Sequence, residues 1–207
     1  MIQKSGTTTV RRVFFGEEDR LEGIYASAGQ DLGAVISHPH PLMGGDMHNH
    51  VVRTISDSLL SCGISTLLFN FRGVGKSAGS FDSGCGEQAD LLAARSFLKA
   101  HNCRKTLLAG YSFGAWVSAM TLSALEESHA LLVAPPLELF PFAWDDIANR
   151  ISLMIGAEHD AYCPPNNLKR IALELRCTLI MIPDADHFFT HRETALADAI
   201  ADFYGAH

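Results

Sequence analysis

The sequence has no long hydrophobic run. Its 207 residues contain no stretch near the roughly 20 consecutive apolar residues of a membrane-spanning helix, and residues 1–15 lack the apolar core of a secretory signal peptide. Basic residues are also scarce, since 16 lysines and arginines stand against 23 acidic residues, for a formal net charge of −7. Because a negative chain repels phosphate backbones, we predict a cytoplasmic protein that binds neither a membrane nor a nucleic acid.

Cysteines are few and show no pairing pattern. The five lie at positions 62, 85, 103, 163 and 177, and no two of them form a Cys-x-x-Cys motif. Free thiols in a reducing compartment are the simplest interpretation of an odd, scattered set. None lies in a tight turn from a strand into a helix, so we do not expect a cysteine nucleophile.

The composition is typical of one compact domain. Hydrophobic residues make up 47% of the chain and charged residues 19%, below the roughly 25% that is usual in soluble domains. A chain of this length commonly forms one domain around one core. We therefore predict a single domain over residues 1–207.

Short apolar runs alternate with longer segments of helical period, and this alternation predicts an α/β fold. The first two strands are expected to form a hairpin around the polar turn 16–19, and Asp46 is expected to cap the first helix. Strands are expected at 8–15, 21–26, 33–37, 64–71, 106–110, 130–134, 152–156 and 178–182, and helices at 47–60, 87–100, 113–125, 167–175 and 192–204.

The segment Gly-Tyr-Ser-Phe-Gly at 110–114 predicts a nucleophile. It follows a buried strand and precedes a helix, and glycines on either side of Ser112 permit the sharp turn that exposes the serine oxygen. The start of the helix adds partial positive charge where negative charge would develop. We therefore predict Ser112 as the attacking group.

A serine hydroxyl needs a base, and the base needs an orienting carboxylate. His187 follows the last expected strand, and Asp160 follows the strand at 152–156, so both lie at the same sheet edge as Ser112. We predict His187 as the base and Asp160 as its acid, with Glu158 as the rival acid.

Stabilising a tetrahedral oxyanion takes at least two hydrogen-bond donors. The N–H of Phe113 is expected to be one of them, because it directly follows the nucleophile. The other should come from the loop after the strand at 33–37, where Pro39 and Pro41 have no N–H to give. That leaves His40 as the predicted donor and Leu42 as the alternative.

Together these motifs resemble the α/β-hydrolase family over nearly the whole chain. The segments SHPHPLMGGDMHNHVV and FNFRGVGKSAGSFD are similar to a subgroup of small lidless bacterial hydrolases described as esterases of the dienelactone-hydrolase-like type. The resemblance implies a mainly parallel, eight-stranded sheet with helices on both faces. It also implies hydrolysis of a small ester or thioester through an acyl-enzyme, as in carboxylesterases, without cofactor or metal.

Only about seventeen residues separate Ala134 from Ser152, where larger relatives carry a lid. We therefore expect an open, shallow pocket that favours short acyl groups. Four side chains are candidates for substrate contact, although the two aromatic ones after position 134 fit core packing better: Leu42, Tyr111, Phe140 and Trp144.

Two other functions remain open on the sequence. His38, His40, His48 and His50 cluster within thirteen residues, and imidazoles are common zinc ligands, so a metal-dependent hydrolase is one alternative. A non-catalytic interaction module on the same fold is the other, because a fold alone does not guarantee chemistry.

Overall fold

The structure is a computed structural model that describes residues 9–17, 20–29, 31–126 and 128–205. Its centre is one eight-stranded sheet in the order β1-β2-β4-β3-β5-β6-β7-β8. β2 runs antiparallel to both β1 and β4, and the strands from β4 to β8 are parallel. The strands are β1 (Thr9–Phe15), β2 (Leu21–Ser27), β3 (Leu32–Ser37), β4 (Ser65–Phe69), β5 (Lys105–Tyr111), β6 (Ser128–Val133), β7 (Ile151–Ala157) and β8 (Thr178–Ile182).

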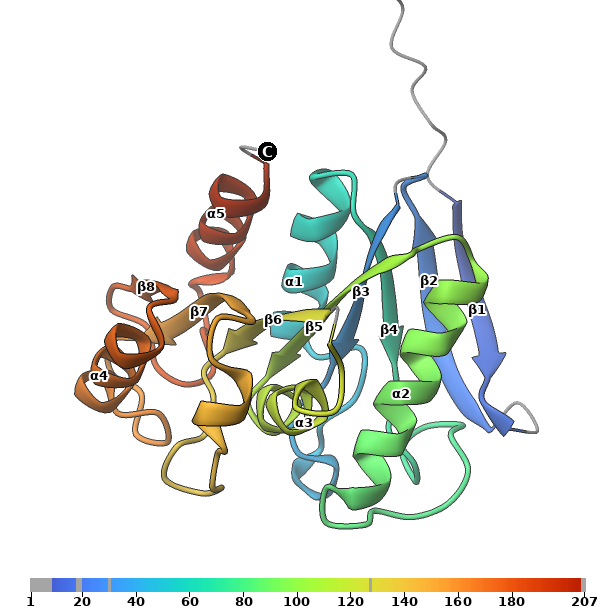
Figure 1. The fold of residues 1–207 in the computed structure, drawn as a ribbon, viewed down its shortest axis with the longest axis horizontal. Coiled ribbons are helices and arrows are strands. Elements are labelled where there is room, and N and C mark those ends of the chain that lie inside the picture. The colour runs from blue at the N-terminus through green and yellow to red at the C-terminus, as the bar shows by residue number, and fades with distance from the viewer. Residues whose placement is uncertain (1–8, 18–19, 30, 127, 206–207) are drawn as a thin grey trace, which may run out of the picture.

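Helices cover both faces of the sheet (Figure 1). The apolar faces of α1 and α5 pack on one side in one hydrophobic cluster, and those of α2, α3 and α4 pack on the other side in a second cluster. The helices are α1 (His50–Ser61), α2 (Cys85–Ala100), α3 (Phe113–Leu122), α4 (Pro165–Leu175) and α5 (Glu193–Tyr204). The predicted α/β fold with a mainly parallel, eight-stranded sheet is confirmed.

The connection from β6 to β7 carries no lid. Residues 134–150 form a loop with one short 3₁₀ helix, η3 (Trp144–Ile147), and run directly into the next strand. This confirms the lidless architecture expected from the short spacing. In the part of the chain that the structure describes, no helix combines the length and the apolar character needed to cross a membrane.

The start of α1 differs from the prediction. The N-cap is Asn49, whose Oδ1 accepts hydrogen bonds from the N–H groups of Val51 at 3.0 Å and Val52 at 3.4 Å. Asp46 instead accepts from the N–H of His48 at 2.8 Å, so it fixes the turn before the helix. The expected cap at Asp46 was wrong because a second capping side chain lies three residues further on. Thr8, Glu18 and Asp19 of the predicted hairpin lie outside the described residues.

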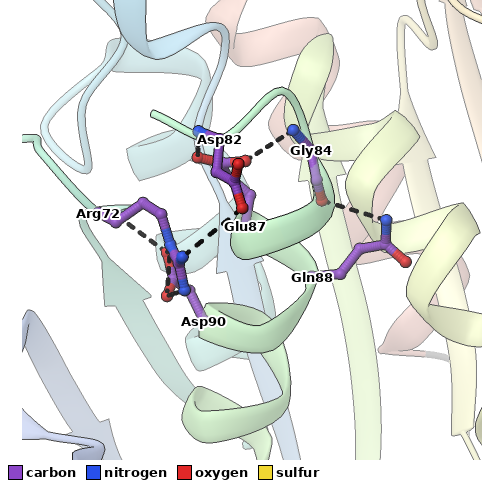
Figure 2. Close-up of polar contacts among 6 residues, drawn as sticks. All are labelled: Arg72, Asp82, Gly84, Glu87, Gln88 and Asp90. Atoms are coloured by element: carbon purple, nitrogen blue, oxygen red, sulfur yellow. Dashed lines mark hydrogen bonds and ion pairs between the residues drawn. The ribbon is translucent and has the colours of Figure 1, made fainter. Parts of the chain in front are cut away.

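The carboxyl ends of the parallel strands meet at one edge of the sheet, and the loops that follow them gather there. The loop between β4 and α2 is held by a polar network (Figure 2). Arg72 donates from its guanidinium to the buried Asp90 at 2.8 Å and from its backbone N–H at 2.9 Å. The carboxylate of Glu87, also buried, accepts from the N–H groups of Asp82 at 2.9 Å and Gly84 at 2.7 Å.

This network fixes the loop from both ends. Arg72 stands at its start and Gly84 at its end, while Asp90 and Glu87 belong to the first turns of α2. Hydrogen bonds between charged groups, such as those from Arg72 to Asp90, are short and strong. Arg72 also gives the buried carboxylate of Asp90 its ionic partner. The loop between them carries Phe81, whose ring packs on the rings of His40 and Phe113.

We expect Arg72→Ala to lower the free energy of unfolding by about 2 kcal/mol, because the buried carboxylate of Asp90 loses its partner. Urea denaturation measures the change. The matched control is Arg104→Ala, which breaks an arginine–aspartate pair of the same 2.8 Å length between exposed side chains and should leave stability nearly unchanged. Equal losses in both variants would contradict the bracing role of Arg72.

Candidate active site

Ser112 lies in a strained turn between β5 and α3. Its φ is 54° and its ψ is −121°, a region that residues other than glycine rarely adopt. The N–H of Ser112 donates to the carbonyl of Val133 on β6 at 3.0 Å, which ties the turn to the neighbouring strand. The structure therefore holds the serine side chain at the carboxyl edge of the sheet.

The two glycines of the motif are required by close backbone contacts. A Cβ atom on Gly110 would lie 2.3 Å from the carbonyl oxygen of Gly114, and a Cβ atom on Gly114 would lie 2.3 Å from that of Ser37. Neither position has room for a side chain. The first contact closes the turn, and the second brings the end of β3 against the start of α3.

Three side chains predicted from separate strands lie together. The hydroxyl of Ser112 is 3.0 Å from Nε2 of His187, and Nδ1 of His187 is 2.8 Å from Oδ2 of Asp160. His187 and Asp160 are both buried. The arrangement is a continuous hydrogen-bonded chain from a hydroxyl through an imidazole to a carboxylate, which can pass a proton from the serine to the histidine.

The carboxylate that lies within hydrogen-bond distance of His187 is that of Asp160 and not that of Glu158. The second oxygen of Asp160 accepts hydrogen bonds from the N–H groups of Tyr162 and Cys163, each at 2.8 Å. Glu158 is exposed and accepts from the N–H of Asp184 at 3.0 Å. Glu158 therefore braces the two loops, while Asp160 faces the imidazole.

Tyr111 positions His187. Its hydroxyl donates to the backbone carbonyl of His187 at 3.0 Å, and burial raises the pKa of this phenol well above its ordinary value. The group thus stays a donor throughout the neutral range. The sequence singled out Tyr111 only as a candidate for substrate contact, and no pattern in the sequence signals a bond that spans 76 residues.

The backbone N–H groups of Phe113 and His40 lie at the two loops that approach Ser112. Phe113 is the first residue of α3, so its N–H has no acceptor within the helix. His40 caps the short 3₁₀ helix η2 (Pro41–Met43), and its Nδ1 accepts the N–H of Leu42 at 3.2 Å. That bond engages the N–H of Leu42, the alternative donor of the prediction.

His38 anchors the loop that carries His40. Nδ1 of the buried ring donates to the carbonyl of Pro39 at 2.6 Å, and Nε2 accepts the N–H of Phe71 at 3.1 Å. These two bonds fix a neutral tautomer, and burial lowers the pKa of the His38 imidazole to about 4. His38 therefore joins the loop after β3 to the loop after β4.

Aromatic rings pack around the His40 side chain. Its ring centroid lies 4.9 Å from that of Phe81 and 4.9 Å from that of Phe113, and Phe140 stacks on it at 6.3 Å. Phe81 comes from the loop that Arg72 braces. The packing holds the His40 ring between the loop that carries Phe81 and the start of α3.

A cavity of about 450 Å³ opens over Ser112 and His187. Tyr111 is the one candidate for substrate contact that lines it within the described residues. Leu42 lies on the exposed side of η2, Phe140 stacks on Trp116 at 4.6 Å, and Trp144 stacks on Phe142 at 4.3 Å. The residues lining the cavity are Pro39, His40, Met43, Gly44, Gly45, Asn49, Tyr111, Ser112, Leu139, Tyr162, His187 and Phe188.

The four clustered histidines do not converge on one point. Both ring nitrogens of His38 are engaged, and Nε2 of His50 lies 2.8 Å from the carbonyl of Phe188. Across residues 9–17, 20–29, 31–126 and 128–205, no group of three metal-ligating side chains within 4.8 Å of one another includes a histidine of this cluster. The arrangement does not favour a metal site there.

Known proteins are similar to this chain in both sequence and fold. The profile of the Alpha/beta hydrolase family matches residues 38–157. An uncharacterized protein from Rickettsia prowazekii is 32% identical over 205 residues, covering 92% of this chain and 86% of that protein.

Two solved structures are similar over nearly their full length. A member of the α/β serine hydrolases without a lid, from Xanthomonas campestris, is 33% identical with a TM-score of 0.82, and the match covers 95% of this chain and 93% of that chain. An α/β serine hydrolase homologue from Coxiella burnetii is 29% identical with a TM-score of 0.81, over 98% and 99% of the two chains.

Because His38 is buried as a neutral imidazole, we expect the free energy of unfolding to fall in acid. Because its pKa is about 4 in the folded protein and near 6.5 in the unfolded chain, its contribution is complete above pH 6.5 and is lost as the pH falls toward 4. The expected loss is about 3 kcal/mol, measured as the free energy of unfolding at several pH values.

His38→Asn should remove this part of the pH dependence, whereas the control His48→Asn at an exposed position should keep it. If His38→Asn retained the whole loss seen in the wild type between pH 6.5 and 4, the assignment of a neutral buried imidazole would be wrong.

Proposed function

Since the chain belongs to the α/β-hydrolase family, we propose that this hydrolase is a serine hydrolase that cleaves a small ester or thioester through an acyl-enzyme. The observation that carries the proposal is the hydrogen-bonded chain of Ser112, His187 and Asp160, at 3.0 Å and 2.8 Å, beneath an open cavity. The two solved relatives that are about 30% identical are both described as serine hydrolases or their homologues, which supports the same chemistry.

In the first half of the reaction, Nε2 of His187 removes the proton from Ser112 as its oxygen attacks the carbonyl carbon of the substrate. Asp160 stabilises the imidazolium that forms, since its Oδ2 accepts from Nδ1 of the ring. The N–H groups of Phe113 and His40 stabilise the negative oxygen of the tetrahedral intermediate. His187 then donates its proton to the leaving alcohol or thiol, which departs and leaves an acyl group on Ser112.

In the second half, water takes the place of the leaving group. His187 removes a proton from the water, whose oxygen attacks the acyl carbonyl and forms a second tetrahedral intermediate on the same two N–H donors. Collapse of the intermediate releases the carboxylic acid and returns the proton from His187 to Ser112. Every proton transfer in this scheme uses a side chain of the triad, so the proposal needs no cofactor or metal.

Ser112→Ala should lower kcat/KM for a short-chain p-nitrophenyl ester by about a thousandfold or more, because the nucleophile is gone. Release of p-nitrophenol measures the loss. Circular dichroism checks that the variant keeps its fold, and activity of the wild type in a chelator should be unchanged. A loss below tenfold would overturn the role of Ser112, and inactivity of the wild type on all esters and thioesters would favour an interaction module.

The two neighbouring acids offer a matched pair of variants. Asp160→Asn should lower kcat by about a thousandfold to ten thousandfold, because it leaves His187 in the wrong tautomer to accept the serine proton. Glu158→Gln should change kcat by less than about threefold, since this side chain only braces Asp184. Equal losses in both variants, or a larger loss at 158, would transfer the role of the acid to Glu158.

A further inference from the structure

Large apolar side chains are exposed around the mouth of the cavity. Leu139 and Phe188 are each 53% exposed, Tyr162 is 36% exposed and Met43 is 77% exposed, and all four line the cavity over Ser112. They come from four different loops at the carboxyl edge of the sheet. Apolar side chains scattered singly over a surface are ordinary, but four that converge on one cavity indicate a binding site.

Two of these side chains lie beside His187. The ring of Tyr162 lies 4.9 Å from the imidazole and that of Phe188 lies 5.6 Å from it, both edge to face. Leu139 belongs to a loop that contacts the loop of Tyr162, because the N–H of its neighbour Glu138 donates to the carbonyl of Tyr162 at 3.2 Å. Three of the four exposed apolar side chains of the lining thus belong to the loop of the general base or to the two loops joined by this bond.

The chemistry of the reaction fixes which part of a substrate reaches this side. His187 must pass its proton to the oxygen of the departing alcohol, so that oxygen has to lie within hydrogen-bond distance of Nε2. The carbon atoms attached to this oxygen then continue into the space next to the imidazole. Leu139, Tyr162 and Phe188 are therefore placed to contact the alcohol portion of an ester.

In the described part of the lining, the side of the oxyanion donors offers one exposed apolar side chain. His40 lines the cavity there with Pro39, Met43, Gly44 and Gly45, and Met43 is 77% exposed. The aromatic rings of Phe81 and Phe113 pack against the His40 ring, and neither is among the described residues that line the cavity. An acyl group on this side meets Met43 alone among the exposed apolar side chains that the structure describes in the lining, which agrees with the short acyl groups expected from the lidless sequence.

The lack of charged side chains among the described residues of the lining also limits which alcohols the cavity can bind. Within the described residues, the cavity lining contains no lysine, arginine, aspartate or glutamate. A charged alcohol would lose its hydration there without gaining a partner, whereas an uncharged one would bury apolar surface.

We propose that Leu139, Tyr162 and Phe188 form a subsite for the apolar, uncharged alcohol portion of an ester with a short acyl group. The proposal rests on the serine mechanism proposed above and adds the substrate class. Each methylene that the subsite buries fully should raise kcat/KM by about fourfold.

Two matched series of esters test it. Acetates of straight-chain primary alcohols from butanol to octanol share one leaving-group reactivity and differ by four methylenes on the alcohol side. Ethyl esters from butanoate to octanoate differ by the same four methylenes on the acyl side. Because the rim is open, we expect about half burial, so kcat/KM should rise at least tenfold along the acetates and stay flat or fall along the ethyl esters.

Acid release is followed in a pH-stat at concentrations where each ester is fully dissolved. A flat acetate series, or a rise confined to the ethyl esters, would overturn the alcohol subsite. In either case dependence on Ser112 would preserve the serine mechanism, whereas hydrolysis that survives Ser112→Ala would overturn both proposals.

Variants locate the subsite through the ratio of kcat/KM for octyl acetate to that for butyl acetate, which cancels effects on the chemical step. Leu139→Ser and Phe188→Ser, on separate loops, should each lower this ratio at least threefold. The control Leu173→Ser, at an 80% exposed leucine of α4 that does not line the cavity, should leave it unchanged. A ratio unaffected by both rim variants, or lowered equally by the control, would contradict the assignment.

Discussion

The contact between the start of α3 and the end of β3 is the constraint on which the site depends. A Cβ atom on Gly114 would lie 2.3 Å from the carbonyl of Ser37, so the helix approaches the strand as closely as a backbone can. This approach brings the N–H of Phe113 next to the loop that carries His40. Ser112, two residues before Gly114, adopts a backbone conformation with φ of 54°, whose strain the surrounding sheet must offset.

Each group of the site is held by a bond from outside the triad. Asp160 accepts two backbone N–H groups, the carbonyl of His187 accepts the hydroxyl of Tyr111, and His38 ties the loop of His40 to Phe71. Such supports reduce the reorganisation required when charge develops during a reaction. The loops after β3, β7 and β8, which carry these groups, also carry exposed apolar side chains of the rim: Met43, Tyr162 and Phe188. The placement of the candidate site and the contacts proposed for a substrate are therefore built on one edge of the sheet.

The sequence predicted the strands, the nucleophile turn and the positions of Asp160 and His187, because strand ends and a five-residue motif are local features. Contacts between distant segments escaped it. The bond from Phe71 to His38 spans 33 residues, and the choice between His40 and Leu42 depends on a side chain that folds back on its own loop. Only the start of the first helix was misplaced, because Asp46 and Asn49 are both good caps and geometry alone selects Asn49. The sequence does not reveal that Leu139 and Phe188 are exposed, because most leucines and phenylalanines of this chain belong to the core.

The proposed function depends on an activated hydroxyl at Ser112. Labelling with a fluorophosphonate, followed by mass spectrometry of the digested protein, tests it directly because this reagent reacts with serine oxygens that a neighbouring base activates. We expect one adduct per chain, on the peptide that contains Ser112, and a much slower reaction when His187 is replaced by alanine. An adduct on another residue, or no adduct on the intact folded chain, would rule out Ser112 as the nucleophile.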